Sequence, residues 1–195
     1  MASNAEEPSV RASLLRLYLR HIDAARPGDA TPVREALGAE AVARIERASG
    51  HEWLPIAYEV AILRALRARH GDEAPRAVGR AVGRAAVDDA ILRPLVRATL
   101  IMLGRRPDVL VHIALAGWRI ATRNACRLAV SSRADGEVRL SMVDIPPVMR
   151  DRAMLLRMDG SLEALLGYGG VAAEVETDWE AGAAHATVRV RWSRG

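Results

Sequence analysis

Glycine and arginine recur at a helical spacing in one stretch of this chain, RAVGRAVGRAAVDD at residues 76–89. Gly79 and Gly83 are four residues apart, as are Arg80 and Arg84, so each pair shares one face of a helix. Glycines that bind phosphate usually lie in a loop before a helix N-terminus, with a lysine or a hydroxyl group nearby. We therefore expect these residues to form a helix-packing surface or an interface, and an anion site is the alternative.

A second set of candidate residues combines aromatic rings with polar atoms. Trp53, Tyr58, Trp118 and Trp179 are conspicuous because the chain has four tryptophans, three tyrosines and no phenylalanine. Such side chains line ligand pockets as well as cores. His112 could ligate a heme or hydrogen-bond to a phenolic ligand, or it could simply pair with Asp108 one turn earlier. Ordinary core packing is the competing interpretation for all of these side chains.

Residue types argue against most catalytic and metal chemistry. All 28 basic residues are arginine, so no lysine can form a Schiff base or bind phosphate in a P-loop. The single cysteine, Cys126, cannot form an internal disulfide or a thiolate metal cage, and its alternation with apolar residues predicts a buried small hydrophobe. No nucleophile elbow or pair of catalytic acids is present. We predict no catalytic residues, no metal site and no cofactor, and we leave enzymatic activity open.

Charge and hydropathy limit the partners. The formal net charge is +4, but the arginines are interspersed with Asp and Glu, and no basic run is interleaved with aromatics. This pattern does not favour nucleic-acid binding. The longest mostly apolar run, at 109–118, is too short to span a bilayer, and residues 1–10 lack a signal-peptide layout. We expect a cytoplasmic protein without nucleic-acid or membrane partners.

Hydrophobic periodicity predicts the fold class. Apolar residues recur at helical spacing over about 10–25, 31–49, 55–68, 75–87, 89–103 and 107–122, with an N-cap at Asp88 and a kink at Pro94. The helix over 107–122 is apolar almost all round and should be buried. From Asn124 the period becomes two, giving hairpins on either side of a helix over 148–168.

We therefore predict a disordered tail over 1–9 and a single α+β domain over 10–195. Its helical half covers 10–123, and a ββαββ unit with a four-stranded antiparallel sheet covers 124–193.

Several segments carry a resemblance to a known family. They are EWLPIAYEV at 52–60, AVGRAVGRA at 77–85, GRRPDVLVHIALAGWRIATRNACRLAV at 104–130, DGSLEALLGYGG at 159–170 and ATVRVRW at 186–192. In order and spacing they resemble an uncharacterised family of myxobacterial paralogues of similar length. That family is related in fold to the heme-NO-binding domain, the 4-vinyl-reductase-type domain and TRAPP subunits.

The chain departs from these relatives at their ligand motifs. The 4-vinyl-reductase-type domains carry zinc-binding cysteines between the last two strands, where this chain has only His185. Heme-NO-binding domains use a helical histidine with a tyrosine-serine-arginine motif, and the corresponding stretch here, VDIPPVMRDRAM at 143–154, lacks that motif. The resemblance therefore implies the fold without implying either metal.

Two functions follow as hypotheses. The first is a non-catalytic regulatory or scaffolding module that self-associates or binds a protein partner, since no catalytic constellation is present. The alternative is a small-molecule sensor that binds an apolar or aromatic ligand between helices and sheet, with heme as a weaker variant. In the related sensor domains the pocket lies between the helices and the sheet, so the resemblance implies a candidate ligand-binding set of Trp53, Tyr58, His112 and Trp118. The implied fold and these four residues support the alternative.

Overall fold

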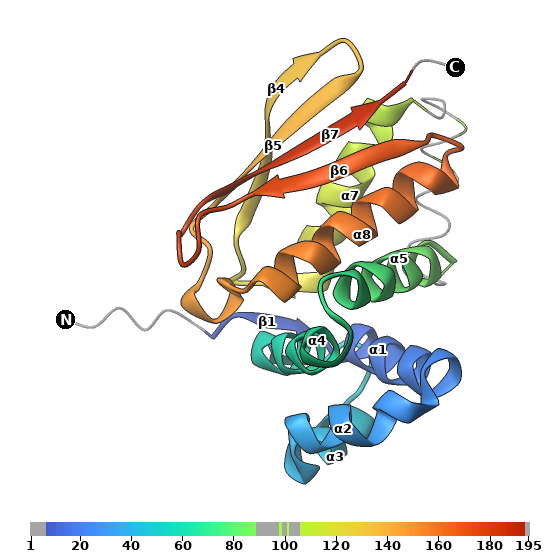
Figure 1. Cartoon of the computed structure of the whole chain (residues 1–195), viewed down its shortest axis with the longest axis vertical. Helices are drawn as coiled ribbons and strands as arrows, with labels where there is room; N and C mark the ends of the chain where they lie inside the picture. Colours follow the sequence, from blue (N-terminus) through green and yellow to red (C-terminus); the bar gives the residue numbers. More distant parts are fainter. Residues whose placement is uncertain (1–6, 89–97, 99–100, 102–105, 194–195) are drawn as a thin grey trace, which may run out of the picture.

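The computed structural model describes residues 7–88, 98, 101 and 106–193 (Figure 1). A helical half comes first and a sheet with its covering helices comes second. The elements of the first half are β1 (Ser9–Arg11), α1 (Ala12–Ala25), α2 (Pro27–Leu37), α3 (Ala39–Arg47), β2 (Trp53–Pro55), α4 (Ile56–His70) and α5 (Glu73–Asp88). Those of the second half are α7 (Pro107–Ala121), β3 (Thr122–Arg123), β4 (Arg127–Ala134), β5 (Glu137–Val143), the 3₁₀ turn η1 (Pro147–Met149), α8 (Arg152–Tyr168), β6 (Ala173–Asp178) and β7 (Ala186–Trp192).

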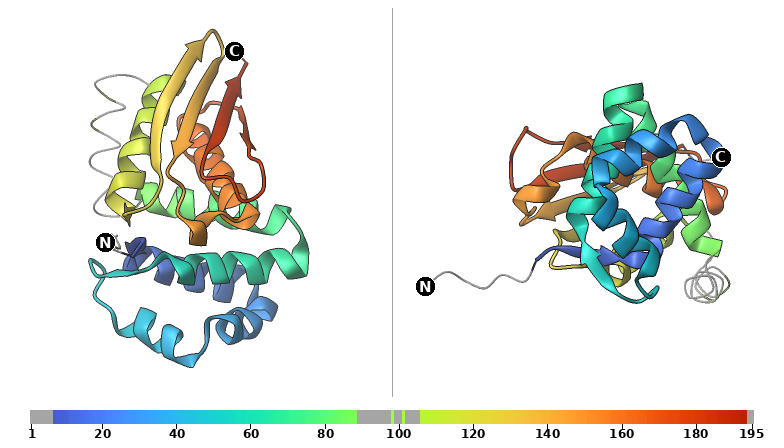
Figure 2. Two further views of the ribbon diagram at one scale, coloured as in Figure 1. Left: turned by 90° about the vertical axis from the view of Figure 1, so that its left-hand side faces the viewer. Right: turned by 90° about the horizontal axis from the view of Figure 1, so that it is seen from below.

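The second half confirms the predicted ββαββ unit and the α+β class. Its strands pair antiparallel in the order β4-β5-β7-β6. Helices α7 and α8 lie against one face of this sheet (Figure 2). Alternate residues of the two central strands are buried under these helices: Val138, Leu140, Met142, Val188 and Val190. The period-two pattern in the sequence therefore marks the covered face of the sheet.

The first half differs from the sequence prediction in three places. Gly38, with φ of +80°, separates α2 from α3 where a single helix over 31–49 was expected. Glycine adopts this backbone angle without a steric penalty. A three-stranded sheet in the order β2-β1-β3 was not predicted, because its strands are only two or three residues long. Its strand β1 starts at Ser9, inside the range expected to be a tail.

Helix α7 is less buried than its composition suggested. It begins at Pro107, and it buries Leu110, Val111 and Leu115, but His112, Arg119 and Ile120 are exposed. The prediction of a helix buried all round is therefore wrong. The predicted helix over 89–103, with its cap and kink, lies outside the described residues.

One core joins the two halves. A continuous cluster of buried residues runs from Val10 and Leu15 in the helical half to Leu140 and Val190 in the sheet. Helix α8 lies between the sheet and α5, and α5 in turn contacts α1 and α4. No helix within the described ranges is both long and apolar enough to cross a membrane.

Candidate functional site

The glycines of the repeated stretch lie where α5 crosses α8. A Cβ atom added at Gly79 would come within 2.1 Å of the carbonyl oxygen of Arg157, and one at Gly160 within 2.0 Å of the carbonyl oxygen of Arg76. A Cβ at Gly83 would lie 3.1 Å from Ser161. The two backbones can therefore approach this closely only because glycine occupies the crossing. The partner of the predicted packing surface is α8 of the same chain.

The neighbouring arginines hold the same crossing from outside. Arg80 donates to Glu163 Oε2 on α8 at 3.1 Å and also binds Glu73. Arg76 donates from Nε to the other oxygen of Glu163 at 3.0 Å. Arg84, one turn further along α5, is exposed. The stripe of arginines thus reinforces helix packing at its half-buried edge.

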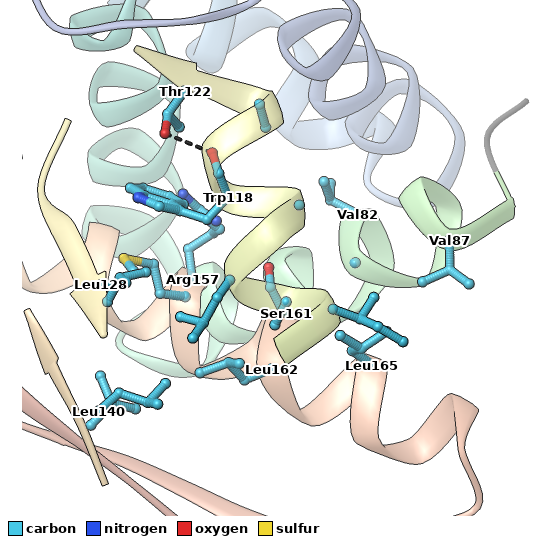
Figure 3. A pocket seen from close by; sticks show the side chains of 18 of the residues that line it. Val82, Val87, Trp118, Thr122, Leu128, Leu140, Arg157, Ser161, Leu162 and Leu165 are labelled. Atoms are coloured by element: carbon cyan, nitrogen blue, oxygen red, sulfur yellow. Dashed lines mark hydrogen bonds between the residues drawn. The ribbon is translucent and has the colours of Figure 1, made fainter. Parts of the chain in front are cut away.

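A cavity of about 160 Å³ lies on another side of α8, under α7 (Figure 3). Its walls come from α5, α7, α8 and the covered face of the sheet, and they are almost entirely apolar. Side chains that form these walls include Val82, Ile113, Trp118, Leu140, Leu162, Leu165 and Val188. The cavity thus lies between helices and sheet.

Two of the polar side chains on this wall use their hydroxyl hydrogens within the protein. Thr122 Oγ1 donates to the carbonyl of Trp118 at 2.8 Å, and Ser161 Oγ donates to the carbonyl of Gly79 at 3.1 Å. The indole nitrogen of Trp118 donates to the carbonyl of Cys126 at 3.1 Å. Arg157 remains as the polar group whose donors are not all used.

Arg157 reaches from α8 to the cavity and ends in a buried ion pair. Its Nη2 lies 2.8 Å from Glu59 Oε1, and the hydroxyl of Tyr18 donates to the same oxygen at 2.6 Å. Glu59 and Tyr18 are fully buried, and Arg157 is 6% exposed. The guanidinium also lies 5.5 Å from the centroid of the Trp118 ring, a cation–π distance (Figure 3). This buried cluster (Tyr18, Glu59 and Arg157) links α1, α4 and α8 at the cavity.

Burial and mutual attraction fix the protonation states of the cluster. Burial raises the pKa of the Tyr18 hydroxyl well above its usual range, and the Glu59 carboxylate raises it further. Burial lowers the pKa of Arg157, but the combined attraction of Glu59, Tyr18 and Cys126 more than offsets this effect, and the net shift is upward. Burial also raises the pKa of the Cys126 thiol, to about 12. Near neutral pH the Tyr18 hydroxyl and the neighbouring Cys126 thiol are therefore neutral, and Arg157 is a cation.

Two buried atoms of the cluster have no hydrogen-bond partner among the described residues. They are Nε of Arg157 and Oε2 of Glu59. An unpaired buried donor or acceptor is costly, about 1–3 kcal/mol, and such atoms are few in folded proteins. Arg157 lines the cavity, whereas Glu59 does not. The Nε atom of Arg157 has almost no accessible surface, so other atoms of this side chain form its part of the cavity wall.

Of the four predicted ligand-binding residues, only Trp118 lines the cavity. Trp53 lies in the small sheet, with the guanidinium of Arg11 3.7 Å above its ring. Tyr58 is half-buried at the edge of the core. His112 is exposed and hydrogen-bonds to Arg133.

The expected pairing of His112 with Asp108 is wrong, because Asp108 binds Arg106, 2.9 Å away. Residues one turn apart on a helix need not meet when a nearer cation competes. Cys126 is 4% exposed, which confirms its prediction as a buried small hydrophobe.

Sequence reasoning missed the buried cluster. Tyr18, Glu59 and Arg157 are far apart along the chain, and nothing local connects them. One signal was available: Glu59 falls on the apolar stripe of its helix with Leu63 and Leu66, which are also buried. A charged residue on a buried stripe needs a partner elsewhere, and that requirement could have prompted a search for an arginine.

Comparison with solved structures identifies the fold. An H-NOX protein from K. algicida, crystallised in the Fe(II) unliganded state, superposes with a TM-score of 0.65 at 12% identity, covering 94% of this chain and 97% of that one. The H-NOX of T. tengcongensis gives 0.60 at 17% identity, covering 94% and 98%. A further match, with a TM-score of 0.60 at 16% identity, comes from work on heme distortion in the H-NOX family.

The chain therefore has the H-NOX fold, the heme-NO-binding fold that the sequence resemblance implied. No family model and no curated protein matches the chain. The narrower resemblance to a myxobacterial family thus stays a prediction.

A heme does not fit the residues of this cavity. Heme iron is held by an axial histidine, cysteine, methionine or tyrosine. All five histidines, all three tyrosines and the single cysteine lie in the described ranges, and none lines the cavity. Met158 does line it, but methionine holds heme iron together with a histidine, and the described wall offers none. Residues 89–105 contain no histidine, cysteine or tyrosine. Arg157 and Trp118 occupy the space beside α7, and the remaining volume of about 160 Å³ is too small for a tetrapyrrole.

Proposed function

We propose that this chain is a small-molecule sensor domain of the H-NOX fold that binds a small apolar ligand, without heme, in the cavity between α7, α8 and the sheet. The observation that carries the proposal is the apolar cavity itself, about 160 Å³ in volume, beside a well-packed core. The cavity opens partly to the surface, and its walls are almost entirely apolar. A concave apolar pocket with a few polar groups is the usual form of a small-molecule binding site.

The size and lining of the cavity define the ligand class. An apolar cavity of about 150 Å³ in another protein stays dry and binds benzene or xenon. The cavity of this chain has a similar volume and similarly apolar walls, with Trp118 on α7 as one aromatic side. We therefore expect it to take a single small ring or a short branched chain.

The fold supports a sensor rather than a scaffold. The structures that share it are H-NOX proteins, among them one described as an Fe(II) unliganded form. The surface on which self-association was predicted, formed by Gly79 and Gly83, is used inside the chain by α8. No other feature of the described residues favours the scaffolding hypothesis.

The test is a benzene titration followed by two-dimensional NMR. The indole N–H of Trp118 reports on the cavity, because its ring forms part of the wall and its nitrogen is held by Cys126. We expect saturable shifts of this signal and of the methyl groups lining the cavity.

The informative variant is Ala114→Leu, which fills the cavity from α7, and its matched control is Ala116→Leu on the same helix, which does not line the cavity. The first should abolish benzene binding and the second should preserve it. If both variants and the native protein bind equally, or if none binds, the cavity is not a ligand site.

A further inference from the structure

We infer that the cavity takes the apolar end of a longer amphipathic molecule, whose polar end stays in water where the cavity opens beside α7. This inference rests on the proposed function and extends it from the group that fills the cavity to the whole ligand. It follows from three properties of the wall: its closed apolar end, its open end, and the pairing of the one charge on it.

The inner end of the cavity is closed and apolar. Leu140 and Val188 come from the covered face of the sheet, and Met158 and Leu162 come from α8. All four side chains are buried. Figure 3 shows Leu140 and Leu162 on the side of the cavity toward the strands. A volume of about 160 Å³ is enough for about one small ring, so the apolar group of the ligand belongs at this end.

The outer end of the cavity lies along α7, where the wall consists of small residues. Ala114, Gly117 and Ala121 line the cavity, and their spacing of three and four residues places them on one face of the helix. All three are half-buried, as is Leu14, which α1 contributes to the same wall. A Cβ atom added at Gly117 would meet nothing within 4 Å. The partial opening of the cavity is therefore located at this face of α7.

The charge on the wall is already paired. Arg157 is the one ionisable side chain among the described residues of the wall, and it forms an ion pair with Glu59, 2.8 Å away. A charged ligand group inside the cavity would be a third charge beside this buried pair, and an uncompensated buried charge is strongly unfavourable. At the opening the same group would keep its hydration. A charged or strongly polar end of the ligand therefore belongs at the opening.

The two ends of the cavity thus select different chemical groups. Burial at the inner end favours apolar surface, because that surface is removed from water. At the opening a polar group stays solvated and costs nothing, whereas an apolar group there gains little. The ligand class is therefore a small ring or short branched chain joined to a polar group by several methylenes.

Benzene, benzoate and 4-phenylbutyrate share one ring and separate the possibilities. In benzoate the carboxylate is attached to the ring and would be drawn into the cavity, whereas three methylenes separate the two groups in 4-phenylbutyrate. Each probe is titrated into the native full chain near neutral pH and followed by NMR. We expect 4-phenylbutyrate to displace benzene and to bind at least about tenfold more tightly than benzoate. The pKa of its carboxyl group should not change on binding.

Intermolecular NOEs in the native protein give the orientation of the bound probe directly. The ring protons of 4-phenylbutyrate should contact the methyl groups of Leu140, Leu162 and Val188. The methylene next to its carboxylate should contact the methyl groups of Leu14 and Ala121. The reverse orientation would overturn the inference, and this measurement needs no variant.

The variant Ala121→Glu places a negative charge at the opening. Repulsion should weaken the binding of 4-phenylbutyrate about fivefold at low salt and less at high salt, and it should leave benzene binding unchanged. The matched control is Ala116→Glu on the same helix, at a residue that does not line the cavity. It should change the 4-phenylbutyrate affinity less than Ala121→Glu does.

Each result has one meaning. If benzene binds but 4-phenylbutyrate binds no better than benzoate, the inference is wrong and the proposed function stands. Binding of 4-phenylbutyrate without displacement of benzene also overturns the inference, because the probe would then occupy another site. If neither benzene nor 4-phenylbutyrate binds, both the inference and the proposed function are wrong.

Discussion

Helix α8 shows two kinds of packing on two of its sides. Toward α5 the backbones touch, and the glycines at the crossing leave no room for even a methyl group. Toward α7 the side chains leave a cavity of about 160 Å³. Arg157 belongs to both sides, since its carbonyl oxygen faces Gly79 and its guanidinium reaches the cavity. The cavity is therefore not a sign of a loosely packed protein, because the same helix is in close backbone contact with α5 on another side.

The largest effect should come from breaking the ion pair that holds Arg157 at the cavity. Glu59→Gln leaves a buried guanidinium without its counter-charge, and we expect a loss of about 3–5 kcal/mol in the free energy of unfolding. Urea denaturation measures it. The matched control is Asp23→Asn, which removes an exposed partner of Arg34 and should cost less than about 1 kcal/mol. Similar losses for the two variants would mean that the buried ion pair contributes no more to the free energy of unfolding than an exposed one.

Alanine substitutions at the two glycines of α5 test the close contact between α5 and α8, because each adds a single methyl group there. Gly79→Ala would force a Cβ against a backbone carbonyl, so we expect a destabilisation of about 3 kcal/mol. Gly83→Ala meets Ser161 and Ala164 at 3.1 Å, where small shifts suffice, and it should cost under about 1 kcal/mol. Thermal or urea unfolding of both variants gives the comparison. Equal stability of the two would contradict a tight crossing at Gly79.

The side of α8 toward β6 should respond to pH through Asp159. This residue is 3% exposed and accepts a hydrogen bond from Thr177 Oγ1 at 2.5 Å, and burial raises its pKa to about 6 from 3.8. Since the folded state holds this proton more tightly, its contribution to stability is complete below about pH 4. It is lost as pH rises to about 6, by roughly 2–3 kcal/mol at most.

Asp159→Asn should remove this pH dependence and leave the protein more stable than the native chain above about pH 6. Urea denaturation of both proteins at several pH values measures the difference. Parallel curves for the two proteins would show that the pKa of Asp159 is the same in the folded and the unfolded chain, which would contradict the shift caused by burial.

The smallest effect concerns the cavity side. Gly117 lies within α7 on the cavity wall, and a Cβ there would meet nothing within 4 Å. Gly117→Ala should therefore stabilise the chain by about 1 kcal/mol, through helix propensity alone. Thermal unfolding checks this value. A destabilised variant would mean that α7 lies closer to the sheet than the structure has it.

The sequence by itself determined the fold class and the larger elements, although not the short strands β1, β2 and β3. The change of period from 3.6 to 2 near Asn124 marks the boundary between helices and hairpins, because burial of one face imposes that period on any half-buried element. The spacing of Gly79 and Gly83 likewise indicated a helix-packing surface, because two glycines four residues apart lie on the same face of a helix. Trp118 was predicted to bind a ligand because it is a large side chain with both an apolar ring and a polar atom. The structure places it on a helix that covers the sheet, and there it lines the cavity.

Only the tertiary structure decided which distant residues meet. Tyr18, Glu59 and Arg157 come from three helices, and their contact depends on how α1, α4 and α8 pack, which no local pattern encodes. His112 is the opposite case, because a histidine on this helix was predicted to bind a ligand. The packing of α7 instead places its side chain on the surface, where it hydrogen-bonds to Arg133. The volume under α7 likewise depends on the sum of many side chains from separate elements. Local periodicity fixes which face of an element is buried, whereas the site is made by the packing of those faces against one another.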